Sequence, residues 1–333
     1  MPSNQIKNFS NRKSATILFA KKLTINSRRK IIFNILIPLA LILGGCGNRD
    51  DLERIQKFTA LANKAAEGFP TIANDFYLSC LRSAHYRAFL PTRQVNPVVT
   101  RIEVEKDCNE KLQLQDLGTS LIEANEVLVD YVSSLGKLAT DDIIDYSTDI
   151  KGLEGELSKL PKINKSQVEG GINIATILLR AAKDGYRREK LKEVIVSTDD
   201  DLQIFIEGIK TIMNEAYIGI YLRNEESVIN GYYGDYITNL VNNRAEGDTQ
   251  SLTILLLDLD NRWATNKDEV EQKRNFARDY IGILDSIAQN HGALRRMFAN
   301  GKSPSSKEMK KMLDKNTKNL ESFVKKLKDV QSK

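Results

Sequence analysis

The feature that most constrains the fold is a hydrophobic repeat of 3.5 residues that runs from residue 252 to residue 298. Its fourteen positions follow alternating steps of four and three residues, and eleven of them are apolar. This is the spacing of a coiled-coil seam. A continuous helix over that span would be about 70 Å long, too long for a compact fold with short loops. The positions are Leu252, Leu256, Leu259, Trp263, Asn266, Val270, Lys273, Ala277, Tyr280, Leu284, Ile287, His291, Leu294 and Phe298.

Helical stripes of the same kind recur through most of the chain after residue 50. One begins at Leu202, and another runs from Met309 to Val330. The only alternating strand candidate is Val98–Val104, within a long loop. We therefore predict an all-α fold, an elongated antiparallel helical bundle with coiled-coil-like seams over residues 51–333, which could divide into two sub-bundles hinged near residues 159–166. Further helices are expected near residues 51–66, 69–90, 108–138, 141–158 and 165–196.

The charge of the chain is unevenly distributed. The 333 residues include 49 basic and 44 acidic ones, a net charge of +5. Eight basic residues and no acidic residue lie in residues 1–45, which leaves 41 basic and 44 acidic residues after them. The positive balance therefore belongs to the amino-terminal segment and does not indicate an anionic partner of the whole domain. Values of 41% hydrophobic and 28% charged residues exclude collagen-like, disordered and polytopic membrane proteins.

The amino-terminal segment has the three parts of a secretory signal. A basic region ends in Ser27-Arg28-Arg29-Lys30, and the apolar run Ile31–Leu43 follows it. As a helix this run would span about 20 Å, less than the ~30 Å hydrocarbon core of a bilayer. It ends in the small-residue motif Leu43-Gly44-Gly45-Cys46.

This motif resembles the lipobox of bacterial lipoprotein precursors, and the resemblance covers only the export signal. It implies that residues 1–45 are a signal peptide that is removed, that the Cys46 thiol carries diacylglycerol, and that residues 46–50 form a short tether. The implied location is the bacterial cell envelope. Because Gly47 follows the cysteine instead of Asp, it would be the outer membrane facing the periplasm in a Gram-negative cell. An uncleaved anchor or an organellar transit peptide is the alternative, and Arg28-Arg29 also resembles a twin-arginine export signal.

Two cysteines remain once Cys46 is assigned to lipid. Cys80 and Cys108 form an even pair in a compartment that permits disulfides. The loop between them, which contains Pro91 and Pro97, is long enough to fold back. Closing a loop of about 29 residues would contribute roughly 3.6 kcal/mol to stability. We predict a Cys80–Cys108 disulfide, with two free buried thiols as the alternative.

Catalytic, metal and phosphate sites have little support in the sequence. His291 falls in the seam and is expected to be a core histidine bonded to a neighbouring helix, while His85 is expected at the surface or at a cap. Asp199-Asp200-Asp201 is interpreted as the acidic start of a helix. Gly301-Lys302-Ser303 lacks the upstream glycine of a phosphate-binding loop. We predict no catalytic residue, no metal site and no cofactor other than the covalent lipid on Cys46.

A tyrosine-rich stretch is the best candidate for a recognition surface. It holds five of the eleven tyrosines within 20 residues, and the 3.5-residue repeat fails there. Tyrosine suits partner and ligand surfaces, but a bundle layer around a helix break would use the same residues. The five are Tyr217, Tyr221, Tyr232, Tyr233 and Tyr236.

The carboxyl-terminal segment is basic. Lys302–Lys333 holds ten lysines and four acidic residues. A solvated lysine face is the usual explanation, and an anionic surface such as lipid headgroups is the second. Nucleic acid is not expected, because the face lacks interleaved aromatic residues.

These observations favour a lipid-anchored, non-enzymatic structural or protein-interaction module of the cell envelope. Its expected partners are the membrane, through Cys46, and an envelope protein. One alternative is a small-ligand receptor or enzyme with a site between helices near Tyr217–Tyr236. Another is an immunity or inhibitor lipoprotein that captures a toxin.

Overall fold

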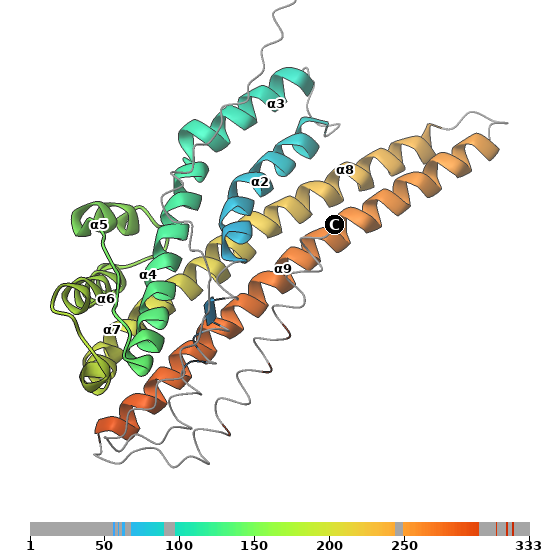
Figure 1. Cartoon of the computed structure of the whole chain (residues 1–333). Coiled ribbons are helices and arrows are strands. Elements are labelled where there is room, and N and C mark those ends of the chain that lie inside the picture. The colour runs from blue at the N-terminus through green and yellow to red at the C-terminus, as the bar shows by residue number, and fades with distance from the viewer. Residues whose placement is uncertain are drawn as a thin grey trace, which may run out of the picture. The chain divides into compact units, whose positions relative to one another are not determined.

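The computed structural model describes residues 68–89, 97–243 and 249–299, together with the single positions 56, 59, 62, 63, 311, 318 and 322. The chain divides into two units, Met1–Gly45 and Cys46–Lys333, and all described residues belong to the second. They form helices and no strand, so the predicted all-α helical bundle is confirmed (Figure 1). None of these helices has the length and apolar character that a bilayer span requires.

The element order places a π-helical segment between two long helices. The described elements are α2 (Phe69–Ala88), α3 (Pro97–Lys106), the π-turn η1 (Asp107–Lys111), α4 (Leu114–Thr140), α5 (Ile150–Ser158), α6 (Lys165–Lys183), the 3₁₀ turn η2 (Arg188–Lys190), α7 (Leu191–Thr211), the π-helix η3 (Ile212–Leu222), α8 (Arg223–Asn242) and α9 (Thr249–Ala299).

The helix α9 has 51 residues and contains all fourteen positions of the seam, so the predicted long helix is confirmed. It packs against α7, η3 and α8 (Figure 1). Three seam positions are polar, and each has a polar partner on another helix. Asn266 accepts a hydrogen bond from the Tyr86 hydroxyl at 2.7 Å, Lys273 Nζ lies 3.7 Å from a Glu225 carboxylate oxygen, and His291 bonds Asp199.

The helices α6 and α7 pack closely along one another. A Cβ atom at Gly170 would lie 2.7 Å from the backbone oxygen of Asp201, and one at Gly171 would lie 2.7 Å from the Phe205 ring. The two glycines therefore allow a close approach in the middle of α6. The break in the helix follows Asp184, at Gly185, whose φ of +63° is the left-handed conformation that glycine adopts easily.

Two sequence expectations about local structure are wrong. Val98–Val104 lies within α3, a helix with the ion pair Arg101–Glu105 at spacing i,i+4 that packs on α2, so the short β-branched run does not form a strand. Asp199-Asp200-Asp201 lies in the middle of α7, not at a helix start. Asp199 is buried there against His291, which is why a carboxylate interrupts this helix face.

Cys80 of α2 and Cys108 of η1 form the predicted disulfide, with Cα atoms 6.0 Å apart. The bond connects α2 to the start of the segment that leads into α4, and α3 packs back on α2 between them. Cys108 is fully buried in the core. The disulfide therefore links α2 directly to η1, the element that precedes α4.

Replacing both Cys80 and Cys108 with Ser is expected to lower the free energy of unfolding by about 3 kcal/mol, because the unfolded chain regains the entropy of the open loop. Urea unfolding followed by circular dichroism measures the change. Adding a reductant should destabilise the wild-type chain by a similar amount and leave the double variant unaffected. An unchanged midpoint in the double variant would contradict a stabilising disulfide.

Candidate functional site

The five tyrosines of the predicted recognition patch separate into two groups. Tyr217 is buried in η3, where its hydroxyl donates to Asp75 at 2.7 Å and its ring lies 4.8 Å from that of Phe76. Tyr221 is partly buried, with its ring edge-on to that of Phe76 at 5.3 Å. Burial, and then the nearby Asp75 charge, raise the pKa of Tyr217 well above its ordinary value. These two tyrosines pack the core within the π-helix η3, which continues from α7 into α8 without the break that the sequence suggested.

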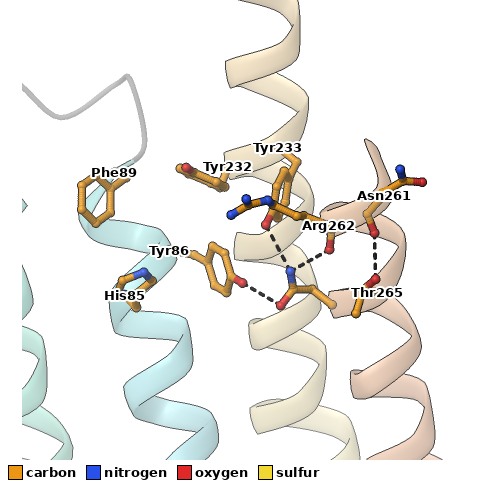
Figure 2. Close-up of a pocket in the computed structure, with 9 residues that line it drawn as sticks. His85, Tyr86, Phe89, Tyr232, Tyr233, Asn261, Arg262 and Thr265 are labelled. Atoms are coloured by element: carbon orange, nitrogen blue, oxygen red, sulfur yellow. Dashed lines mark hydrogen bonds between the residues drawn. The ribbon is translucent and has the colours of Figure 1, made fainter. Parts of the chain in front are cut away.

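The other three tyrosines, Tyr232, Tyr233 and Tyr236, lie on α8 at the surface end of the stretch. Tyr232 and Tyr233 line a pocket of about 510 Å³ between α2, α8 and α9, which we call the aromatic pocket (Figure 2). Tyr236 adjoins it, with its ring stacked 6.1 Å from that of Tyr232. The nine lining residues are His85, Tyr86, Phe89, Tyr232, Tyr233, Asn261, Arg262, Thr265 and Asn266.

Aromatic rings from the α2 end and from α8 face each other across part of the aromatic pocket. The Tyr232 ring lies 5.5 Å from that of Tyr86, 6.4 Å from that of Phe89 and 4.9 Å from that of Tyr233. His85 completes the group, 5.5 Å from Phe89. Figure 2 shows the α2 side chains on one side and the tyrosines of α8 facing them. Such tilted and edge-to-face pairs are favourable arrangements of aromatic rings.

Asn266 holds the inner part of the pocket together. Its side-chain oxygen accepts a hydrogen bond from Tyr86 at 2.7 Å, and its amide donates to the Tyr233 hydroxyl at 3.1 Å and to the Arg262 carbonyl at 2.7 Å. The side chain thus joins α2, α8 and α9 at one point. Because these hydrogen bonds engage the Asn266 side chain, its role in the pocket is structural.

The electrostatics of the pocket are set by one arginine. Arg262 extends across the front of Tyr233 in Figure 2, and its Nε atom lies 2.8 Å from Asp258 on the exposed surface. No carboxylate is among the nine lining residues. Burial, and then the neighbouring rings of Tyr233 and Tyr236, raise the pKa of Tyr232. The Tyr232 hydroxyl is therefore neutral at physiological pH.

A buried cluster of charged side chains lies between α2 and α8 and holds these two helices together. Glu225, only 1% exposed, accepts hydrogen bonds from Ser79 at 2.7 Å and from Arg82 at 2.5 Å. Arg82 also pairs with Asp75 at 2.9 Å, and Lys273 lies 3.7 Å from Glu225. Burial alone would lower the pKa of Arg82, but its hydrogen bonds to Glu225 and Asp75 outweigh this and raise it. The two cations balance the two carboxylates.

A second polar cluster surrounds His291, which is 3% exposed. Its Nδ1 atom bonds the Asp199 carboxylate at 2.6 Å, and its Nε2 atom bonds the Tyr131 hydroxyl at 2.6 Å. Tyr131 in turn lies 2.5 Å from the Thr198 hydroxyl. The expected core histidine bonded to neighbouring helices is confirmed. The order Asp199, His291, Tyr131 hydroxyl resembles that of a catalytic triad, but the histidine and both hydroxyl residues are buried in the bundle.

His85 was expected at the surface or at a helix cap, and it lies at the surface. Its ring contributes to the aromatic pocket. No group of three metal-ligating side chains occurs in the part of the chain that the structure describes. The lipidation candidate Cys46, the tether 46–50 and the basic segment Lys302–Lys333 lie outside the described residues, apart from three single positions of that segment. Nothing in the fold therefore bears on them.

Sequence reasoning identified the α8 side of the pocket and missed the rest. His85, Tyr86 and Phe89 precede the tyrosines by about 150 residues, and nothing local joins the two segments. The one usable signal was Asn266, a polar residue in an apolar seam. A buried amide needs hydrogen-bond partners, so its position indicates where other polar side chains converge.

Comparison of the chain with models of protein families, with curated proteins and with solved structures finds no match in any of the three.

The His291 cluster should make stability depend on acid. Burial would raise the pKa of Asp199, but the hydrogen bonds from His291 and Gln203 and the charges of His291 and Arg295 lower it overall. A lowered folded-state pKa gives stability that is fully present above the ordinary aspartate value of about 3.9 and is lost as pH falls through the folded-state pKa.

We expect Asp199→Asn to reduce the free energy of unfolding at pH 7 by about 2–3 kcal/mol, because a hydrogen bond to a buried charged group is lost. The variant should also lose less stability than the wild type between about pH 5 and pH 2. Urea unfolding at a series of pH values tests both. Asp200→Asn, which removes a neighbouring but exposed partner of Arg295, is the control and should change little. Equal acid sensitivity of Asp199→Asn and the wild type would contradict the assignment.

Proposed function

We propose that the chain is a lipoprotein of the bacterial cell envelope, tethered to a membrane by lipid on Cys46, whose helical domain is a non-enzymatic protein-interaction module. The lipobox-like motif Leu43-Gly44-Gly45-Cys46 supports the anchor. Several acyl chains hold a protein at a membrane effectively permanently, since each buried CH₂ contributes about 0.8 kcal/mol. In a Gram-negative cell, Gly47 favours the outer membrane, facing the periplasm. The covalent lipid is the only cofactor that the proposal requires.

The absence of an accessible catalytic group around His291 supports a non-enzymatic role. Its two ring nitrogens bond Asp199 and Tyr131, and Tyr131 and Thr198 are fully buried. A general base must reach a substrate directly or through one water molecule. In this part of the described chain the polar row joins α4, α7 and α9 and serves their packing.

The observation that carries the interaction role is a surface on the outer part of α8 and α9, residues 236–242 and 249–260, which we call the distal hairpin. Ile254 and Leu257 of α9 are 64% and 61% exposed, and Tyr236 and Val241 of α8 are also exposed. Figure 1 shows this end of the helix pair extending away from α2, α3 and α4. Clustered exposed apolar side chains are typical of protein-binding surfaces.

The arrangement on α9 gives this surface a direction. Ile254 and Leu257 are three residues apart, so they share a helix face, and Asn261 and Thr265 of the aromatic pocket continue the same face. The surface therefore runs from the aromatic pocket toward the end of the hairpin. A partner helix or loop could lie along it.

The charges of the distal hairpin define the partner further. Asp258 and Asp260 are exposed, and residues 236–242 and 249–260 contain no lysine or arginine. An apolar strip with an acidic rim is complementary to a protein surface with apolar side chains and a basic rim. Capture of a basic toxin would be one form of this interaction.

The aromatic pocket supports a second candidate function, that of a small-ligand receptor. It is open to the surface, and some of its polar groups are not used by the fold. Ligand binding at this pocket would be independent of the protein contact at the distal hairpin.

Mass spectrometry of the mature amino terminus tests the anchor. The expected product begins at Cys46 and carries the lipid, and Cys46→Ser should leave an uncleaved precursor that is no longer lipid-modified. The Cys80→Ser, Cys108→Ser double variant is the control and should be lipidated normally. An unmodified, uncleaved Cys46 in the wild-type chain would exclude the proposed anchor.

Photo-crosslinking in the native envelope tests the interaction surface. A photoreactive residue in place of Ile254 is expected to give a defined crosslinked protein. Ile143, which is 63% exposed on the loop between α4 and α5, provides the matched control site and should not. Ile254→Ser with Leu257→Ser should weaken co-purification of that protein by tenfold or more, about 1.4 kcal/mol. Equal crosslinking from Ile143 and Ile254 would overturn the assignment of the surface.

A further inference from the structure

We propose that the aromatic pocket binds an acidic sugar, a pyranose ring that carries a carboxylate. This goes beyond the protein contact of the distal hairpin, because it assigns a ligand class to a separate site on α2, α8 and α9. Three features of the site together lead to this class: aromatic faces, unused hydrogen-bonding groups and a single permanent charge.

The aromatic faces suit one side of a sugar ring. The Tyr232 and Tyr236 rings on α8 are stacked, with an interplanar angle of 10° and centroids 6.1 Å apart, so Tyr236 supports the orientation of the Tyr232 ring. Phe89, which is 48% exposed, and Tyr86 face Tyr232 from α2. A pyranose has an apolar face of C–H groups, and these pack favourably on the electron-rich face of an aromatic ring.

The rim of the pocket supplies hydrogen-bonding groups that the fold leaves unused. Within the described chain, neither the Tyr232 hydroxyl nor the Asn261 side-chain amide has a hydrogen-bond partner, and the Arg262 side chain is 67% exposed beside them. Asn266, by contrast, is fully engaged. A plain hydrocarbon or aromatic ring would leave the rim groups without partners, whereas sugar hydroxyls pair with them.

The charge of the site selects an acid over a base. Arg262 is the permanently charged side chain among the nine that line the pocket, and none of the nine is acidic. Its partner Asp258 is about half exposed, so the pair is weak, and a ligand carboxylate can share the guanidinium. A quaternary ammonium ligand would meet the rings but would be repelled by Arg262.

The size of the pocket agrees with such a ligand. Its volume of about 510 Å³ falls within the ~300–1,000 Å³ range of small-molecule sites. The site is assembled from three helices that Asn266 and the Glu225 cluster hold together. It therefore exists before the ligand arrives, which reduces the entropic cost of binding.

Titration of the purified full chain with N-acetylmuramic acid, monitored by ligand-observed NMR and by calorimetry, tests the proposal. N-acetylglucosamine, which has the same ring without the lactyl carboxylate, is the matched ligand. We expect N-acetylmuramic acid to saturate a single site with a dissociation constant below about 10 mM and to bind at least tenfold more tightly than N-acetylglucosamine.

Variants with matched controls locate the binding site. Arg262→Gln should weaken N-acetylmuramic acid at least tenfold and leave N-acetylglucosamine unchanged. Arg101→Gln, which also removes an arginine from an exposed i,i+4 ion pair, should change neither. Tyr232→Ala should weaken both sugars, whereas Tyr186→Ala, which removes a tyrosine beside Lys190 elsewhere on the surface, should weaken neither.

Circular dichroism confirms that each variant is folded, and Tyr232→Phe provides a second variant that keeps the ring and removes only the hydroxyl. It should retain most of the binding that Tyr232→Ala loses. The proposal is overturned if neither sugar binds, if Arg262→Gln and Arg101→Gln bind N-acetylmuramic acid equally well, or if the two sugars bind with equal affinity.

Discussion

The bundle depends on the pairing of polar side chains inside the apolar seam of α9. Asn266, Lys273 and His291 occupy positions where leucine would pack more simply, and each meets a polar group supplied by another helix. His291 is 3% exposed, and leaving it without partners would cost several kcal/mol. Asn266 and Lys273 are partly buried, and with His291 they help to fix the register of the helices that they contact. Asn266 sets α2 and α8, Lys273 approaches the Glu225 cluster between them, and His291 sets α4 and α7. The apolar positions supply most of the stability, and the polar ones specify which arrangement is stable.

The sequence predicted the parts of this structure that repeat, and it failed where the decisive contacts are between distant segments. The 3.5-residue repeat of α9 continues for so many turns that chance does not produce it. The pairing of Cys80 with Cys108 followed from cysteine number and compartment. The sequence placed Asp199 at the start of a helix, because no local pattern shows that its carboxylate bonds His291, which is 92 residues away. In the same way, half of the aromatic pocket comes from α2, and no local pattern relates Tyr86 to Tyr233.

The two proposed binding sites share one pair of helices. The aromatic pocket lies where α8 and α9 meet α2, and the distal hairpin is the continuation of α8 and α9 beyond it. The buried Glu225 cluster holds the inner end of the pair, and among the described residues the outer end packs through the seam between α8 and α9. A protein that binds the hairpin would also lie beside any sugar held in the pocket.

The π-helix η3 lies between α7 and α8, and the three elements follow one another without an intervening loop from Leu191 to Asn242. Because a π-helix bonds each residue to the fifth one along, it changes the rotational phase of everything that follows. Glu225, Tyr232 and Tyr233 face α2 and α9 only because of that phase. Adding or removing one residue between 212 and 222 would turn them by about 100° around the axis of α8. In this segment, the number of residues is therefore as much a determinant of the binding sites as the identity of any side chain.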